Sequence, residues 1–443
     1  MPSHRAPLVA TTLLLAMASP VVSAGGVTER VSINAAGEPA NADSYEPSLS
    51  GDGRFVVFSS SATNLVNGDR NGSGDVFVHD RATGDTRLVS RSSTGTQGNG
   101  GSGLYAAGPG AISRDGRFVA FTSSATNLVP GDTNGKSDVF VRDLKTGTTV
   151  RASVGPGGRQ ADGDCNSASI SATGRFVLFT SRARNLVPYV GPRQGNLFVR
   201  DLQTGTTTLE GPGPTSGGAA ITLDGHFLVF ESAAPNVVPG RPSDRFNVYR
   251  RDRRSGATTL VSVPPNGGPG FAESSNPFVS DDGSVVAFIS VMRLPNRTFG
   301  GFGAFVRDLR TGTTTRVLAP DGGPPDGPTL VQGISGDGRW LLLESFATNL
   351  VPGDTNDAPD LFVQDRRTRA TTRANVGHSS QQATAPTFDG ALSADGRIVA
   401  FTSASANLVR GSVDGRQEIL VRTPGGASGA VAGSGAGANV PGR

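Results

Sequence analysis

Short runs of consecutive hydrophobic residues, each preceded by a polar turn that contains glycine, recur along this chain. The copy at residues 111–153 shows the unit most completely. There, Phe118-Val119-Ala120-Phe121 follows a Ser-Arg-Asp-Gly turn, a second run, Val139-Phe140-Val141, follows a long polar loop, and an alternating Thr-rich segment follows Thr146-Gly147. Glycine takes the positive φ that tight hairpin turns need, and nothing in the unit has helical periodicity. The unit predicts three strands, with a fourth directly upstream, in one small antiparallel sheet.

The unit occurs seven times and fills the chain, so no room is left for another domain. The first hydrophobic run of each copy is apolar at consecutive positions, which indicates a strand that is buried on both faces. The last segment of each copy alternates and is expected at a wetter edge. All copies share one glycine in the opening turn: Gly53, Gly116, Gly174, Gly225, Gly283, Gly338 and Gly396.

A small sheet that is buried on both faces by copies of itself is typical of one blade in a closed ring. A linear array would need polar capping repeats, and none is visible in the sequence. The seventh copy stops after Ile419-Leu420-Val421-Arg422, whereas an extra Thr-rich strand, Thr28-Glu29-Arg30-Val31-Ser32, precedes the first copy. We therefore predict an all-β fold at residues 25–424. It is a seven-bladed β-propeller of four-stranded antiparallel blades, and the N-terminal strand closes the ring.

Residues 1–24 have the features of a secretory signal peptide rather than of the fold. A short basic start is followed by an apolar stretch, Leu8 to Met17, and by the small-residue cleavage site Val22-Ser23-Ala24. That stretch is too short to span a bilayer, and no later segment is long and apolar enough. We predict a secreted or periplasmic protein that begins at Gly25. Residues 425–443 are mostly Gly, Ala and Ser, which predicts a disordered tail of undetermined role.

Composition and charge narrow the range of partners. The chain has 62 Gly, 29 Pro and a formal net charge of only +3. It contains no block of Lys and Arg, so nucleic acid is not expected as a partner. Cys165 is the single cysteine, which excludes an intrachain disulfide. We expect a monomer without a transmembrane segment.

The repeated motifs resemble the WD40-like (PD40) propeller repeats of TolB-like proteins. The resemblance rests on the Ser-x-Asp-Gly-Arg turn, the Phe-x-x-Phe strand and the Asp-Val-Phe-Val-Arg-Asp strand, and it covers residues 28–423. It implies a β-propeller that works in the bacterial envelope or outside the cell, usually by binding other macromolecules. TolB itself resembles a six-bladed propeller with an additional N-terminal α/β domain. This chain has seven copies and no such domain, so TolB's partners are not carried over.

Because successive antiparallel strands run in opposite directions, their connections alternate between two faces of the predicted ring. The short Asp-Gly and Thr-Gly turns lie on one face, and the longer, dissimilar connectors lie on the other: residues 91–110, 154–167, 263–276, 319–332 and 376–390. Variable loops on a rigid scaffold usually carry binding specificity. Our first hypothesis is therefore a binding or scaffolding module whose protein or glycan partner contacts the long-loop face. Tyr105 and Phe271 are candidate aromatic anchors there; alternatively, both pack on their own blades and the connectors are only spacers.

Three loops share the pattern Asp-x-Asn-x-x-x-Asp: Asp69, Asn71 and Asp75; Asp132, Asn134 and Asp138; and Asp354, Asn356 and Asp360. Oxygen ligands at alternate positions suit Ca²⁺. Asp and Asn side chains that cap a tight loop explain the pattern without a metal. The sequence leaves calcium open, but capping is the simpler interpretation, so we predict no metal site and no cofactor.

Candidate catalytic groups are scattered. His79, His226 and His378 occupy unrelated repeat positions, and no Gly-x-Ser-x-Gly motif is present. The innermost strands end in pairs without His or carboxylate groups: Leu49-Ser50, Ile112-Ser113, Ile170-Ser171, Ile221-Thr222, Val279-Ser280, Ile334-Ser335 and Leu392-Ser393. We therefore predict no catalytic residues and no enzyme. The alternatives are a hydrolase or lyase with its site at the long-loop face of the channel, and a structural cell-surface protein.

Overall fold

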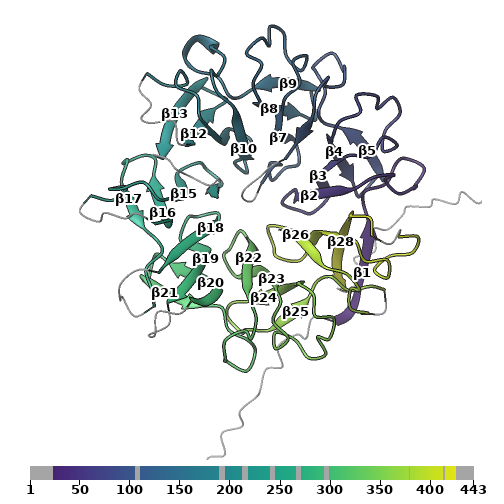
Figure 1. Cartoon of the computed structure of the whole chain (residues 1–443), viewed down its shortest axis with the longest axis vertical. Coiled ribbons are helices and arrows are strands. Elements are labelled where there is room, and N and C mark those ends of the chain that lie inside the picture. The colour runs from purple at the N-terminus through teal and green to yellow at the C-terminus, as the bar shows by residue number, and fades with distance from the viewer. Residues whose placement is uncertain are drawn as a thin grey trace, which may run out of the picture.

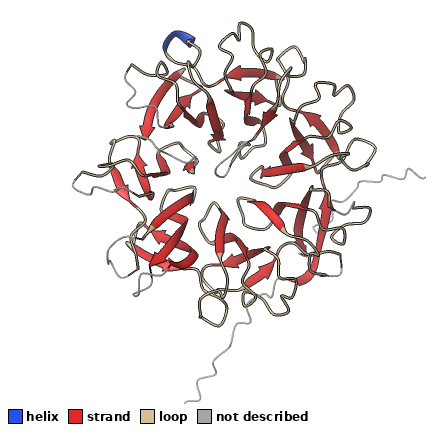
Figure 2. Cartoon of the chain, in the orientation of Figure 1, coloured by secondary structure: helices blue, strands red, loops and turns tan. Residues whose placement is uncertain are grey.

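The computed structural model describes residues 23–104, 110–188, 195–211, 218–239, 245–265, 271–293, 299–378, 380–412 and 415–425. These segments form seven four-stranded antiparallel sheets that are arranged in a ring (Figure 1). Almost all regular structure is strand (Figure 2), and the one described helix is the 3-10 helix η1 (Pro156–Gly158). None of the described helical structure is long and apolar enough to cross a membrane. The predicted seven-bladed propeller is confirmed.

The first three blades contain the following strands, in order from the centre of the ring outward. Blade 1 contains β2 (Ser44–Leu49), β3 (Phe55–Ser60), β4 (Asp75–Asp80) and β5 (Asp85–Leu88). Blade 2 contains β6 (Ser102–Gly103), β7 (Phe118–Ser123), β8 (Asp138–Asp143) and β9 (Thr148–Arg151). Blade 3 contains β10 (Cys165–Ile170), β11 (Phe176–Ser181), β12 (Asn196–Asp201) and β13 (Thr206–Gly211).

The remaining blades follow the same order. Blade 4 contains β14 (Ala219–Ile221), β15 (Phe227–Ser232), β16 (Asn247–Asp252) and β17 (Thr258–Leu260). Blade 5 contains β18 (Glu273–Val279), β19 (Val285–Arg293), β20 (Phe299–Asp308) and β21 (Thr313–Arg316). Blade 6 contains β22 (Thr329–Ile334), β23 (Trp340–Ser345), β24 (Asp360–Asp365) and β25 (Thr371–Arg373). Blade 7 contains β26 (Thr387–Leu392), β27 (Val399–Ser403), β28 (Glu418–Gly425) and β1 (Ser23–Arg30).

The N-terminal strand completes blade 7, as the sequence predicts. β1 pairs antiparallel with β28, with Thr28 opposite Arg422, and the Val31 N–H donates to the Ile419 carbonyl at 2.9 Å. The strand begins earlier than expected, at Ser23, within the predicted signal peptide. Residues 1–22 lie outside the described part of the chain, so the cleavage site stays a prediction.

The glycine of each opening turn meets the preceding blade. Gly116 has φ 73°, and a Cβ built there would overlap the ring of Phe55, the first residue of β3 in blade 1. The same contact closes the ring, because Gly53 of blade 1 lies against Ile398 beside β27 of blade 7. Only glycine combines this left-handed backbone with so close an approach.

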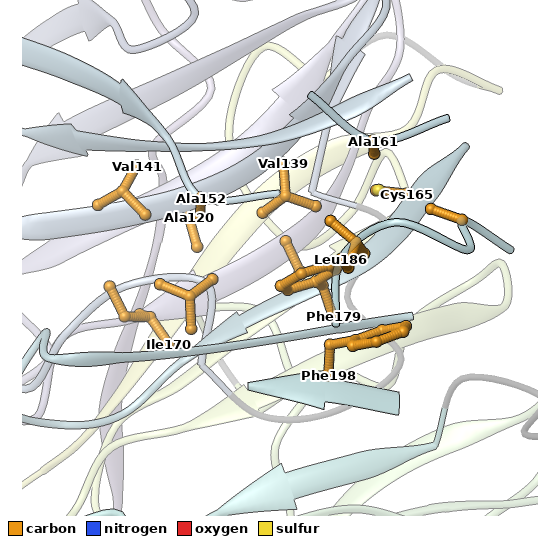
Figure 3. Close-up of a cluster of buried hydrophobic side chains, with 13 residues drawn as sticks. Ala120, Val139, Val141, Ala152, Ala161, Cys165, Ile170, Phe179, Leu186 and Phe198 are labelled. Carbon is orange, nitrogen blue, oxygen red and sulfur yellow. The ribbon is translucent and has the colours of Figure 1, made fainter. Parts of the chain in front are cut away.

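The hydrophobic core lies between adjacent blades. Figure 3 shows one such cluster, in which Val139 and Val141 of blade 2 meet Ile170, Phe179 and Phe198 of blade 3. Phe179 and Phe198 are cross-strand partners whose ring centroids are 5.7 Å apart. Such pairs stabilise a sheet beyond the area they bury.

The single cysteine belongs to this same cluster. The Cys165 thiol is buried and donates to the Ser181 hydroxyl at 3.2 Å. Burial raises its pKa to about 12. A thiol that stays protonated at neutral pH is a poor nucleophile, so Cys165 acts as a core residue.

Deletion of Thr28 to Ile33 should lower the melting temperature far more than deletion of residues 426–443. The first change removes the outer strand of blade 7 and exposes the edge of β28, whereas the second leaves every described strand intact. Thermal melts of both truncations test this. Equal melting temperatures would contradict closure by the N-terminal strand.

Gly116→Ala should destabilise the protein by about 3 kcal/mol, since left-handed strain adds to an overlap with a packed ring. Gly131→Ala is the matched control, because Gly131 has φ 70° and no other group lies within 4 Å of the place that a Cβ would occupy. It should cost only the strain, about 1 kcal/mol. Denaturant unfolding measures both, and equal losses would show that the contact with blade 1 contributes nothing.

Candidate functional site

The inner strands of the seven blades surround a central cavity of about 410 Å³. This volume lies within the range of small-molecule pockets, roughly 300–1,000 Å³. One level of its wall is apolar, and each blade contributes the residue before its turn Ser or Thr: Leu49, Ile112, Ile170, Ile221, Val279, Ile334 and Leu392. This level matches the inner-strand pairs identified in the sequence.

The end of the cavity at the opening turns is bounded by an arc of backbone hydrogen bonds that joins six of the seven blades. Each contributing residue donates its N–H to the carbonyl of its counterpart in a neighbouring blade. Among the described residues, such bonds of 2.9–3.0 Å run from Gly51 to Arg114, Arg114 to Ala172, Asp281 to Gly336, Gly336 to Ala394, and Ala394 to Gly51. Because these bonds join the turns to one another, this end cannot widen without breaking them.

An ion pair also crosses the turn-face end. Arg114 of blade 2 contacts Asp281 of blade 5, with 2.7 Å between Nη2 and Oδ2. Both side chains lie against turns of other blades, because a Cβ at Gly51 would overlap Arg114 and one at Gly336 would overlap Asp281. The ion pair therefore obstructs this end, which leaves the opposite, loop-face end as the open mouth.

At the loop-face end, several inner strands contain a β-bulge. The bulge residue has a left-handed φ although it is not glycine: Glu46 (58°) in β2, Ser167 (55°) in β10, Asn276 (49°) in β18 and Asp389 (47°) in β26. β22 changes register at Gln332. A bulge re-aims the side chain of its extra residue. Glu46, Asn276, Gln332 and Asp389 all line the cavity.

Carboxylates of the second strands support these residues. The Gln332 amide donates to Glu344 in β23 of the same blade, with 2.6 Å between Nε2 and Oε2. The Asn276 N–H donates to Oε2 of Glu231, in β15 of the preceding blade, at 2.8 Å. We use the term polar tier for the following residues of blades 1, 5, 6 and 7: Glu46, Asn276, Gln332, Glu344 and Asp389.

Two carboxyl groups of the polar tier have raised pKa values. Burial raises the pKa of Glu344, the hydrogen bond from Gln332 opposes this shift, and the negative charge of Asp389 adds to it. Desolvation in the cavity raises the pKa of Asp389, although its side chain is exposed at the mouth and a hydrogen bond from the Glu46 backbone N–H opposes the shift. Carboxyl groups with raised pKa values at a cavity are typical of binding and catalytic sites.

The polar tier was missed at the level of the sequence. The pairs beside each turn serine contain no carboxylate and therefore predict no ring of carboxylates around the channel. The bulge residues lie four positions before that serine, as Glu46 does before Ser50 and Asp389 before Ser393. Charged or amide residues at this position in several aligned copies were the signal that could have revealed them.

The two predicted aromatic anchors have different outcomes. Tyr105 lies outside the described residues. Phe271 is half-buried, and its ring centroid lies 4.6 Å from that of Phe305 and 5.9 Å from that of Phe288. It packs against its own blade, so it is a weaker anchor than expected, and its role in binding stays a prediction.

The described histidines do not meet. His79 is buried and its Nδ1 lies 2.9 Å from the Thr86 hydroxyl, whereas His226 Nε2 lies 3.0 Å from Asp252 Oδ1. His378 is exposed in the connector that leads to blade 7. The structure therefore brings together none of the scattered groups noted in the sequence.

In two of the acidic loops, an arginine contacts both aspartates. Arg151 lies 2.9 Å from Asp132 and 3.5 Å from Asp138. Arg373 is equivalent in blade 6, at 3.2 Å from Asp354 and 3.1 Å from Asp360. A buried guanidinium thus neutralises the pair of carboxylates that a calcium ion would otherwise bind.

The third acidic loop, in blade 1, lacks this arginine. Leu88 occupies the position of Arg151, as its pairing with Phe77 shows. The Gln97 amide donates instead, with Nε2 at 2.7 Å from Asp69 and 2.8 Å from Asp75. Within the described ranges, no group of three or more His, Cys, Asp or Glu residues could hold a metal ion. Amide and guanidinium contacts are sufficient to hold the three loops.

No protein-family model matches the sequence, and no curated protein matches it. Solved structures do match. The β-propeller domain of the Trilobed protease from Pyrococcus furiosus has a TM-score of 0.52 at 12% identity, over 85% of this chain and 97% of that chain. An oligogalacturonate lyase in complex with manganese has a TM-score of 0.50 at 12% identity, over 90% of this chain and 93% of that chain. A puromycin-hydrolyzing peptidase from Mycobacterium tuberculosis has a TM-score of 0.52 at 13% identity, over 86% of this chain and 52% of that chain.

A putative TolB from Agrobacterium tumefaciens is among the matches, with a TM-score of 0.41 at 15% identity, over 76% of this chain and 94% of that chain. At such identities these matches show the β-propeller fold alone. The PD40 assignment of the repeats therefore remains a resemblance.

The expectation that this chain is not an enzyme is contradicted. The matched structures include a lyase and a peptidase, so this fold does not exclude catalysis. The expectation also relied on a channel without carboxylates. Glu46 and Asp389 line the cavity at its loop-face end, Glu344 lies behind Gln332, and the pKa values of Asp389 and Glu344 are raised.

Arg151→Leu should lower the free energy of unfolding by about 3 kcal/mol, because it leaves Asp132 and Asp138 buried without their cation. Added Ca²⁺ should restore part of the loss in this variant and leave the parent protein unchanged. Arg87→Leu, at an exposed position of β5, is the control. Thermal melts with and without Ca²⁺ measure all three proteins. A calcium-dependent shift in the parent would overturn the assignment of Arg151 as the neutralising cation.

Proposed function

We propose that this chain is an exported β-propeller that binds a protein or glycan partner at the loop-face mouth of its central channel. The difference between the two ends of the channel carries the proposal. The turn-face end is bounded by an arc of backbone hydrogen bonds and obstructed by the ion pair of Arg114 with Asp281. At the loop-face end, Glu46, Asn276, Gln332 and Asp389 of the polar tier line the cavity.

The backbone conformation of the polar tier supports a binding role. Glu46, Asn276 and Asp389 are held in left-handed conformations, each of which costs about 1–3 kcal/mol in a residue other than glycine. Such strain persists where the surrounding structure enforces it, and it is concentrated at functional sites. A concave cavity with an apolar wall and a few convergent polar groups is the usual form of a ligand site.

A hydrolase is the second candidate, and one observation favours it. Glu344 and Asp389 are neighbouring carboxyl groups with raised pKa values at the same mouth. A carboxyl group whose pKa is raised is better suited to donate a proton to a leaving group, while a second carboxylate assists a nucleophile. Glycoside hydrolysis is the reaction for which this pair is best suited. In this role Glu344 and Asp389 would act on the bond of a bound glycan.

Arrays of glycans and peptides probed with the purified protein test the site. Asp389→Asn should weaken binding of the true ligands by at least about tenfold, since it removes a charge-assisted contact at the mouth. Asparagine tolerates the left-handed conformation of Asp389, so the variant should fold. Asp85→Asn, at an exposed position on the outermost strand of blade 1, should leave binding unchanged.

Two outcomes of this experiment decide between the candidates. Ligands that bind Asp389→Asn as well as the parent would show that the mouth is not the site. Cleavage products that form from a bound glycan with the parent, and disappear with Glu344→Gln, would favour the hydrolase. Mass spectrometry of the incubated ligands provides this measurement.

A further inference from the structure

Three exposed phenylalanines lie at the loop-face ends of consecutive blades. Phe302 and Phe346 are each 52% exposed, and Phe388 is 39% exposed. Among the large hydrophobic residues that are exposed in the described segments, only these three are aromatic. We call Phe302, Phe346 and Phe388 the aromatic patch. Of the three, Phe302 lines a separate small pocket with Phe246 and Glu273, and Phe388 directly precedes Asp389 of the polar tier. An exposed aromatic side chain beside a cavity is a candidate anchor for a ligand.

The strand register places each member of the aromatic patch. Phe302 pairs with Val291 at the loop-face end of the β19–β20 hairpin in blade 5. This hairpin extends further than the hairpins of other blades; β23 of blade 6, for comparison, has six residues. Phe346 directly follows β23 of blade 6. Phe388 is the second residue of β26 in blade 7 and directly precedes Asp389 of the polar tier. The patch and most of the polar tier therefore belong to the same three blades.

The charge at the mouth is negative. The cavity lining contains Glu46 and Asp389 near the mouth, and Glu344 lies behind Gln332. Arg114, the one basic residue in the described lining, is paired with Asp281 at the opposite end. A negatively charged ligand would be repelled here, whereas a cationic group would compensate carboxylates that burial disfavours.

We propose that the mouth at blades 5–7 binds the end of a glycan chain whose terminal sugar carries a protonated amino group. The inference rests on the proposed function and specifies its ligand. The ammonium group pairs with Asp389 and Glu46, the hydroxyl groups bond the amides of Asn276 and Gln332, and the apolar face of the sugar packs on Phe388. The obstructed turn-face end admits a chain end but no chain that passes through the ring.

The mixture of polar groups favours a sugar over a basic protein segment. Asn276 offers amide donors and an acceptor, and Gln332 offers its amide oxygen and the N–H that does not donate to Glu344. A lysine side chain presents a single ammonium group on an aliphatic stem and has no acceptor for these amide donors. An amino sugar presents several hydroxyl groups and one cation within a single ring.

Isothermal titration of the full protein with four defined probes tests this inference. The probes are tetramers of glucosamine, N-acetylglucosamine and galacturonic acid, together with tetralysine. The glucosamine tetramer should bind at least about tenfold tighter than its N-acetylated counterpart, because only its amines are charged. Galacturonate should not bind. Asp389→Asn should weaken glucosamine binding by about tenfold or more, and Phe388→Ala by about three- to tenfold.

Controls and contrary outcomes separate this inference from the proposed function. Asp85→Asn and Val150→Ala change an exposed acid and an exposed apolar residue on outer strands and should leave binding unchanged. Equal affinity for the acetylated tetramer, or equally tight and Asp389-dependent binding of tetralysine, would overturn the amino-sugar assignment. If no probe binds but ligands from the arrays still depend on Asp389, the amino-sugar assignment is also overturned. In that case the mouth remains the binding site. If no ligand of any kind depends on Asp389, the proposed function fails as well.

Discussion

The close approach of each opening-turn glycine to the preceding blade is the contact on which the ring depends. The backbone turn has a left-handed residue at this point, and the first side chain of the neighbouring second strand fills the space where a Cβ would lie. The contact recurs from blade to blade and also joins blade 1 to blade 7. Blades therefore pack at one spacing, and hydrophobic clusters such as the one in Figure 3 form between them.

This packing also determines the shape of the channel. Because the opening turns are drawn together, their backbones hydrogen-bond to one another at the turn face. At the loop face the inner strands are free to bulge, and the register shifts of β2, β18 and β26 direct Glu46, Asn276 and Asp389 to the cavity. Burial between blades supplies the stability that offsets the strained backbone of these residues.

The sequence was sufficient to predict the ring but not its mouth. A repeated turn glycine followed by consecutive apolar residues requires a strand with neighbours on both faces, and the missing strand of blade 7 indicates how the ring closes. The polar tier depends on β-bulges, and a bulge reverses the side-chain alternation from which orientation is inferred. Arg151 was missed for a different reason. Its contact with Asp132 joins β9 to the loop before β8, and the position of that loop relative to β9 was unknown before the structure.

Within each repeat, one position is the same in every blade and another differs from blade to blade. The turn glycine is unchanged in all seven copies, since any side chain there would disturb the contact between blades. The bulge position carries Glu46, Ser167, Asn276 and Asp389 in different blades, because the backbone needs a left-handed residue there but the packing between blades does not select the side chain. A ring built from one repeated contact can therefore present a different chemical group from each blade to a single cavity. The carboxylates and exposed phenylalanines gather on neighbouring blades for this reason, and the mouth is chemically one-sided although the ring is nearly symmetric.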